Sequence, residues 1–316
     1  MTHTNEEQPS DTLTSDSGYI QQLTFAGCPG FMRRPFSREL AGIDLAITGI
    51  PFDCATTNRP GTRLGPRAIR EQSTLQAHDA PYGWEFDPFE SLRMVDYGDC
   101  QFDFGCVALV PAAIEKHIAG ILDQNTAVLS LGGDHYVSYP VLKAHAAKFG
   151  PLSLIQFDAH SDTWEDESPD RIDHGTMFRR AIEEGVVLPE HSVQVGIRTT
   201  NPDTMGVNII DAPTVHSLSA SAVAEQIKSI VGSRPCYLTF DIDCLDPAFA
   251  PGTGTPVSGG LSCAQGMDIL RALKGDLSLK GMDVVEVSPP FDHAGVTAIA
   301  GAHMAVELIC LWASCR

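Results

Sequence analysis

The chain has 316 residues, 43% of them hydrophobic, so it is long enough to bury a large core in one α/β domain or in two smaller domains. Its formal net charge of −19 argues against a nucleic-acid or anionic-membrane partner and favours cationic ligands or metal ions. The nine cysteines include no C-x-x-C pair and are odd in number, which argues against a disulfide framework and predicts reduced thiols in a cytoplasmic protein.

The N-terminal seventeen residues are rich in Ser, Thr, Asp and Glu. They lack the apolar core of a secretory signal and the Arg-rich face of a transit peptide, so we expect a flexible tail over 1–17. No uninterrupted apolar run approaches the ~20 residues of a membrane helix, so we expect no membrane span. No repeat, linker or change of composition follows residue 20, which favours one domain over 18–316.

Strand and helix patterns alternate along this domain. Short runs, nearly continuous in apolar residues, are typical of strands buried on both faces. In chain order they cover 44–51, 92–97, 127–131, 152–157, 193–197, 236–240 and 282–287. The clearest helical patterns cover 111–123, 136–148, 219–231 and 296–313. This alternation predicts an α/β fold with a mostly parallel sheet sandwiched by helices.

Ligand-type residues follow three of these strands, at the carboxyl edge where sites form in parallel sheets. After the strand 127–131, Gly132 and Gly133 end the run, Asp134 is a candidate helix cap, and His135 is a candidate ligand.

The second cluster places Asp158, His160 and Asp162 at alternate positions after the strand 152–157. A fully extended chain would separate the two carboxylates by ~13 Å, too far to bind one ion. We therefore predict that the chain turns after His160.

In the third cluster, Asp241 and Asp243 follow the strand 236–240, and Pro247 stops the ladder. Taken alone, each cluster is better explained as a turn, a cap or a solvated histidine. Taken together, they place charges that would be costly to bury unpaired, which favours a cation. Four carboxylates and two neutral imidazoles predict two divalent ions, best matched by manganese, with water as the nucleophile.

These clusters stand in the motifs GGDH, DAHSD and DIDCLDPAFAPGTGTPVSGGL, and two further motifs cover 49–53 and 65–70. Together they resemble the ureohydrolase family of arginases and agmatinases over essentially all of the chain after residue 20. The resemblance implies an arginase/deacetylase-like three-layer α/β/α fold and a homotrimer or homohexamer.

The resemblance also implies a ligand set for each ion. One ion would be held by His135, Asp158, Asp162 and Asp241, and the other by Asp158, His160, Asp241 and Asp243. Asp158 and Asp241 would bridge the two ions.

Two more residues match functional positions of the family. Glu286 matches the carboxylate that meets the substrate guanidinium, and His174 matches a proton-shuttling histidine that would act with Asp162. From the residues alone, Glu286 is also consistent with an internal salt bridge, and His174 with an ordinary loop histidine.

The substrate is expected to be agmatine, which would yield putrescine and urea. Arginases read the amino-acid end of arginine partly through an Asn, and Trp164 stands at that position here. Trp164 is suited to line a passage or to take an ammonium over its face. The main alternative is 4-guanidinobutyrate, because Arg179 and Arg180 offer positive charge. Less favoured alternatives are a catalytically silent binding protein and a single-zinc, deacetylase-like enzyme on a related scaffold.

Overall fold

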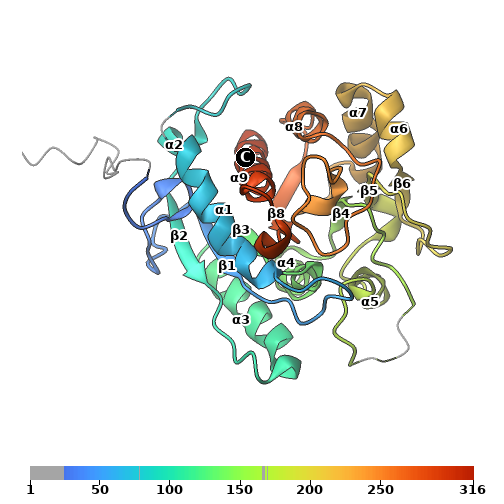
Figure 1. Ribbon diagram of the computed structural model, residues 1–316, viewed down its shortest axis with the longest axis horizontal. Helices are drawn as coiled ribbons and strands as arrows, with labels where there is room; N and C mark the ends of the chain where they lie inside the picture. Colours follow the sequence, from blue (N-terminus) through green and yellow to red (C-terminus); the bar gives the residue numbers. More distant parts are fainter. Residues whose placement is uncertain (1–24, 78, 166–167, 169) are drawn as a thin grey trace, which may run out of the picture.

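The computed structural model describes residues 25–77, 79–165, 168 and 170–316, so the predicted tail over 1–17 lies outside the described residues. The described chain contains one parallel sheet of eight strands in the order β2-β1-β3-β8-β7-β4-β5-β6 (Figure 1). The strands are β1 (Leu45–Ile50), β2 (Met94–Asp99), β3 (Ala127–Gly132), β4 (Ser153–Phe157), β5 (Val193–Val195), β6 (Asn208–Ile210), β7 (Pro235–Asp241) and β8 (Ser278–Val285).

Helices cover both faces of this sheet. One face carries α1 (Gly65–Ser73), α2 (Pro88–Ser91), α6 (Ala212–Ser217), α7 (Ala220–Val231), α8 (Cys263–Ala272) and α9 (Val296–Ser314). The other face carries α3 (Val110–Leu122), α4 (Ser138–Phe149) and α5 (Met177–Glu183), which lie below the sheet in Figure 1. The predicted three-layer α/β/α fold is therefore confirmed.

Side-chain alternation along the strands explains the two helix layers. Leu45 and Ile47 of β1 pack into the core beneath α9, whereas Ala46 and Ile50 pack into the core with α3 and α4. All four side chains are fully buried, as expected for a parallel sheet covered on both faces. This burial is why the strand runs read as almost continuously apolar.

The C-terminal helix α9 is a core helix of this fold. By length and composition alone its 19 residues could cross a membrane, but 78% of its most apolar window is buried inside the protein. Leu308, Ile309 and Leu311 belong to the same core as β8. Apolar character all round this helix is therefore explained by burial between other elements.

The sequence patterns missed or misplaced several elements. Strand β6 has only three residues, too few to give a pattern, and the short helices α2, α5 and α6 were not predicted for the same reason. The run 282–287 was expected to be strand throughout, but β8 ends at Val285 and Glu286 has a positive φ of 64°. The end of β8 therefore differs from the prediction at a candidate functional residue.

Candidate metal centre and active site

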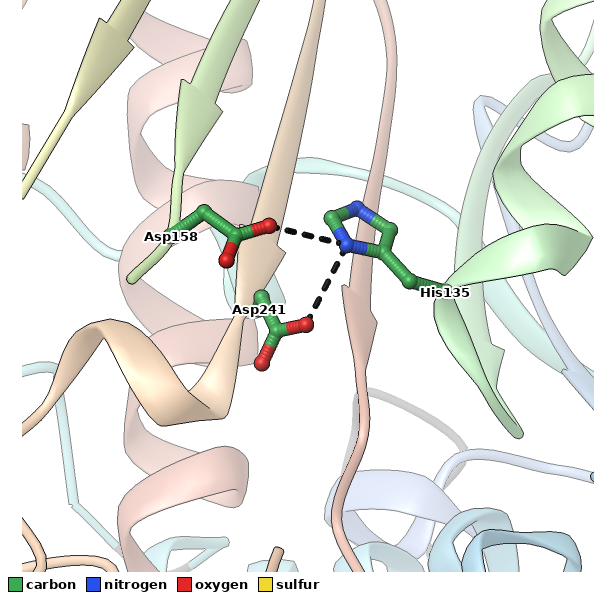
Figure 2. Close-up of side chains that lie close together, drawn as sticks. All are labelled: His135, Asp158 and Asp241. Atoms are coloured by element: carbon green, nitrogen blue, oxygen red, sulfur yellow. Dashed lines mark ion pairs between the residues drawn. The ribbon is translucent and has the colours of Figure 1, made fainter. Parts of the chain in front are cut away.

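The candidate ligands lie at the carboxyl ends of four adjacent strands in the middle of the sheet. His135 follows β3, Asp158 directly follows β4, Asp241 is the last residue of β7, and Glu286 directly follows β8. Parallel strands bring these ends to the same edge. Figure 2 shows His135, Asp158 and Asp241 pointing toward one another from three of these elements.

Three carboxylates converge on one nitrogen of His135. Its Nδ1 lies 3.0 Å from Asp158 Oδ2, 3.0 Å from Asp162 Oδ2 and 3.1 Å from Asp241 Oδ2. All four residues are buried, and His135 Nδ1 makes no hydrogen bond within the described part of the chain. A buried nitrogen aimed at three carboxylate oxygens fits a divalent cation of the type that accepts both nitrogen and oxygen ligands.

A second group shares Asp158 with the first. His160 Nδ1 lies 3.1 Å from Asp243 Oδ2 and 3.5 Å from Asp158 Oδ1, so Asp158 presents one oxygen to each histidine. Asp241, which is expected in both groups, presents Oδ2 to His135, and its Oδ1 accepts a 2.8 Å hydrogen bond from the Asp243 amide. The two groups are thus joined chiefly through Asp158.

The predicted turn after β4 is confirmed. The strand ends at Phe157, and Asp162 adopts a left-handed backbone conformation with φ 53°. This reversal brings Asp162 back beside Asp158, so that both reach His135. Positive φ at a non-glycine residue costs about 1–3 kcal/mol and is found where surrounding contacts impose it.

The cluster carries more negative than positive charge, and the pKa values reflect this. Burial lowers the pKa of His160, but Asp243 and Asp158 raise it more, to about 12. Burial also lowers the pKa of His135, but Asp158, Asp162 and Asp241 raise it well above its ordinary value. Burial and the neighbouring Asp158 raise the pKa of Asp162 to about 6. The site therefore holds protons strongly, and bound cations would displace them.

A row of buried polar side chains lies one layer below the ligands, and sequence reasoning missed it. Gln156 Nε2 donates to Asp158 Oδ2 at 2.8 Å, Gln194 Nε2 donates to Gln156 Oε1 at 2.8 Å, and His135 Nε2 lies 2.8 Å from Thr239 Oγ1. The row crosses neighbouring strands in register and consists of Thr48, Ser130, Asp283, Thr239, Gln156 and Gln194. Its signal in the sequence is a polar residue within each otherwise apolar run.

His174 and Glu286 form a pair beside the ligand groups. His174 Nδ1 lies 2.8 Å from Glu286 Oε1, and the Thr57 amide donates to His174 Nε2 at 3.0 Å. Burial lowers the pKa of His174, but Glu286 raises it, giving a net rise to about 9. This raised pKa favours a protonated ring at neutral pH, whereas the Thr57 amide can only donate and therefore requires an unprotonated Nε2. The fixed position of the amide decides for the neutral ring with its proton on Nδ1 in this geometry.

Glu286 is held by the backbone around it. Its Oε1 also accepts a 2.8 Å hydrogen bond from the His135 amide, and its own amide donates to the Gly133 carbonyl. Its Oε2 is buried without a hydrogen-bond partner in the described residues. No Arg or Lys forms an ion pair with Glu286 in the described chain, so the salt-bridge alternative finds no support there. One carboxylate oxygen thus remains available for a cation.

The glycine turn before His135 is tightly packed. A Cβ at Gly133 would overlap the Phe52 carbonyl oxygen, so only glycine fits there. The expectation that Asp134 caps the following helix is wrong, because its side chain makes no cap hydrogen bond and its Oδ2 accepts from the Ala55 amide at 2.8 Å. Asp134 instead ties the loop after β1 to the edge of the site.

A cavity of about 360 Å³ opens onto the ligands. It is lined by Thr57, His160, Asp162, Trp164, Glu165, Arg171, Asp173, His174, Gly175, Thr176, Asp241 and Thr255. Trp164 is 45% exposed at this cavity, as expected for a residue that lines a passage. Arg179 is not among the lining residues, and its guanidinium binds Asp203 at 2.7 Å.

The comparisons with known proteins agree with this architecture. The sequence model that describes the arginase family matches residues 43–310 of this chain. The agmatinase of Chromobacterium violaceum is 54% identical over 289 residues, covering 91% of this chain and 89% of that protein. The agmatinase of Proteus mirabilis is 48% identical, covering 90% of this chain and 93% of that protein.

Solved structures give the same result. The crystal structure of a hypothetical agmatinase from Burkholderia thailandensis has a TM-score of 0.91 at 55% identity, covering 93% of this chain and 94% of that one. Proclavaminate amidino hydrolase from Streptomyces clavuligerus has a TM-score of 0.85 at 37% identity, covering 93% of this chain and 100% of that one. With a family model spanning most of the chain and relatives at about half identity, this chain belongs to the arginase family and is an agmatinase-like ureohydrolase enzyme.

Proposed function

We propose that this enzyme hydrolyses the guanidinium group of agmatine to urea and putrescine, with two manganese ions bound. The observation that carries the proposal is the pair of ligand groups joined by Asp158, which lie next to a carboxylate with one unpaired buried oxygen, Glu286 Oε2. The relatives named agmatinase, at 48% and 54% identity, support agmatine as the substrate.

One ion would be held by His135, Asp158, Asp162 and Asp241, and the other by Asp158, His160, Asp241 and Asp243, so that Asp158 and Asp241 are shared. When bound, they would supply a water nucleophile at neutral pH and stabilise the charge that develops on the guanidinium carbon's substituents. The four carboxylates balance the charge of two divalent ions. A ligand set with this many oxygen atoms favours manganese, whereas zinc in structural sites is bound by Cys and His. The charge and the ligand types of these residues therefore fit two divalent ions.

Glu286 would bind and orient the substrate guanidinium. Its free Oε2 can accept hydrogen bonds from guanidinium N–H groups, and its charge matches the substrate cation. The backbone amide of His135 fixes Oε1, so the carboxylate is oriented before substrate arrives. A preoriented acceptor lowers the entropic cost of placing the reacting carbon.

His174 and Asp162 would together move a proton to the nitrogen that leaves the guanidinium carbon. The imidazole lines the cavity and lies 2.8 Å from Glu286 Oε1, the oxygen next to the free Oε2 at which the guanidinium would bind. Imidazole can accept and release a proton near neutral pH, which the collapse to urea and a primary amine requires.

The far end of the substrate would lie near Trp164 and Glu165, which both line the cavity. A terminal ammonium suits the aromatic face and the carboxylate, and the interaction with the ring is worth ~0.5–2 kcal/mol. A carboxylate, as in 4-guanidinobutyrate, would instead require a cation. Arg171 lines the same cavity, bound to Asp173 at 2.7 Å, and this observation makes 4-guanidinobutyrate the second candidate.

Urea release by the manganese-loaded protein tests the proposal. Agmatine, arginine and 4-guanidinobutyrate are supplied at equal concentration, and agmatine is expected to give the highest kcat/KM. A preference for 4-guanidinobutyrate would overturn the substrate but keep the chemistry. Absence of urea from all three, with two ions bound, would favour the catalytically silent alternative.

The substitution Trp164→Ala tests the role of this side chain in binding, and it should raise KM for the preferred substrate more than it lowers kcat.

The proposal extends to a cytoplasmic homotrimer or homohexamer. All nine cysteines are free, consistent with a reducing compartment. Sedimentation velocity of the metal-loaded enzyme measures the assembly directly, and a monomer would contradict this part of the proposal.

A further inference from the structure

We propose that Asp283 is a positioning residue for the metal centre, acting on His135 through the Thr239 hydroxyl. The inference rests on the proposed metal centre and assigns a role to two residues outside both ligand groups. Asp283 lies in β8, and Thr239 lies opposite it in β7. Neither residue lines the active-site cavity.

The link begins at the histidine nitrogen that faces away from the carboxylates. His135 presents Nδ1 to Asp158, Asp162 and Asp241, so Nε2 is the nitrogen that keeps its proton when a cation occupies the group. Nε2 lies 2.8 Å from Thr239 Oγ1. The histidine therefore donates to the threonine oxygen, and the threonine must direct its own proton elsewhere.

Asp283 offers an acceptor on the next strand, because its Oδ1 is buried without a hydrogen-bond partner in the described residues. Thr239 and Asp283 are register partners between β7 and β8, and both are fully buried. Both belong to the row of buried polar side chains, in which His135 Nε2 contacts Thr239 directly. The Thr239 hydroxyl would direct its proton to this carboxylate, which places the histidine, the hydroxyl and the carboxylate in one chain.

The surroundings of Asp283 favour a carboxylate held in one orientation. Its Oδ2 accepts hydrogen bonds from Ser138 Oγ at 2.7 Å and from Tyr237 Oη at 2.8 Å, whereas its Oδ1 has no hydrogen-bond partner in the described residues. No Arg or Lys forms an ion pair with it in the described chain. Burying a carboxylate without a cation is costly, which indicates that its charge is used by the cationic centre above it.

A carboxylate behind a ligating histidine does two things. It fixes the ring in the tautomer that leaves Nδ1 free, and it makes that nitrogen a stronger donor to the cation. Removing such a partner typically weakens metal binding ~10–100-fold. Asp283 lies between Ser130 of β3 and Thr239 of β7 in the row of buried polar side chains, so the neighbouring strands fix its position.

Manganese titration of the chelated enzyme by calorimetry tests the inference, with Kd and ion number as readouts besides activity. Thr239→Val and Asp283→Asn should each raise the Kd of one ion ~10–100-fold, whereas Thr239→Ser, which keeps the hydroxyl, should stay within ~3-fold of wild type. Ser138→Ala is the matched control, because Tyr237 Oη still holds the same oxygen of Asp283 and Ser138 lies off the route to His135. It should also stay within ~3-fold.

The double variant Thr239→Val/Asp283→Asn separates a linked pair from two independent sites. A linked pair should lose no more affinity than the worse single variant, whereas losses that multiply would overturn the route. Wild-type affinity in Thr239→Val, or an equal loss in Ser138→Ala, would also overturn it while leaving the proposed function intact. If Asp283→Asn does not fold, the Thr239→Val and Thr239→Ser pair decides, since neither changes a buried charge. A wild-type enzyme that binds no manganese would overturn the proposed function as well.

Discussion

His174 Nδ1 and Glu286 Oε1 lie 2.8 Å apart, although the two residues are separated by 112 positions in the chain. The pair occupies only one oxygen of Glu286, and the His135 amide binds the same oxygen. The second oxygen is left for the substrate, so one carboxylate touches the candidate proton shuttle, the metal-ligand loop and the expected position of the guanidinium.

Substitution Glu286→Gln should lower kcat/KM for agmatine by ~10²-fold or more, because it removes the charge that pairs with the guanidinium and keeps the size of the side chain. Initial rates of urea release measure the effect, and calorimetry should still find two manganese ions. Glu307→Gln is the matched control, since Glu307 is another nearly buried carboxylate whose partners are Arg271 and Trp84. Equal losses in both variants would contradict the proposed role.

Asp158 and Asp243 should differ in the number of ions that each supports. Asp158 belongs to both ligand groups and Asp243 to one, so Asp158→Asn should bind no ion and Asp243→Asn should keep one. Elemental analysis after dialysis counts the ions. Two ions and full turnover in Asp158→Asn would exclude its bridging role.

Removal of the metal should destabilise the folded enzyme. A ligand that binds only the native state, at 100 times its Kd, stabilises it by ~2.7 kcal/mol. Thermal unfolding with and without a chelator should therefore give a lower Tm after chelation, and the Asp158→Asn variant should not respond. A chelator effect of the same size in that variant would show that the shift comes from another site.

Substitution Gly133→Ala should destabilise the protein by several kcal/mol, because the added Cβ would overlap the Phe52 carbonyl and displace the turn before His135. Gly120→Ala is the matched control, because its Cβ would meet no atom within 4 Å in helix α3. The control should gain ~0.5–1 kcal/mol from helix propensity. Denaturant unfolding measures both changes, and similar values would contradict the steric argument.

His145 should make stability fall in mild acid. Burial lowers its pKa to about 4, from about 6.5 when the chain is unfolded. Between these two values the unfolded state binds the extra proton, so stability is complete above pH 6.5 and decreases as the pH falls toward 4, by up to ~3 kcal/mol. The variant His145→Leu should show a shallower decrease in denaturant unfolding over this range. An unchanged slope would mean that this histidine does not contribute.

The clustering of the candidate ligands was predictable because each is a charged or imidazole residue that follows an apolar strand. Asp158, Asp241 and His135 each interrupt such a run, and burial of that kind of residue needs a partner. The alternation of strand and helix patterns along the chain likewise predicted the parallel sheet and its two helix layers. The family resemblance then indicated Glu286 and His174, whose spacing alone is not distinctive.

Other features depend on which strands are neighbours, and local patterns do not encode this. Thr239 and Asp283 become partners only because β7 lies beside β8, and Thr57 reaches His174 from a distant loop. The side chain of Asp134 was misassigned because Asp before a helix usually caps it, whereas here the Ala55 amide competes for it. Tertiary contacts overrode the local preference in each case.

The position of β8 has a consequence for biosynthesis. This strand is the last to leave the ribosome, yet it lies in the middle of the sheet, between β3 and β7. Without it, the strands β2-β1-β3 and β7-β4-β5-β6 have no continuous hydrogen-bonded connection through the sheet. We therefore expect the candidate ligands on β3, β4 and β7 to come together only after β8 has been synthesised.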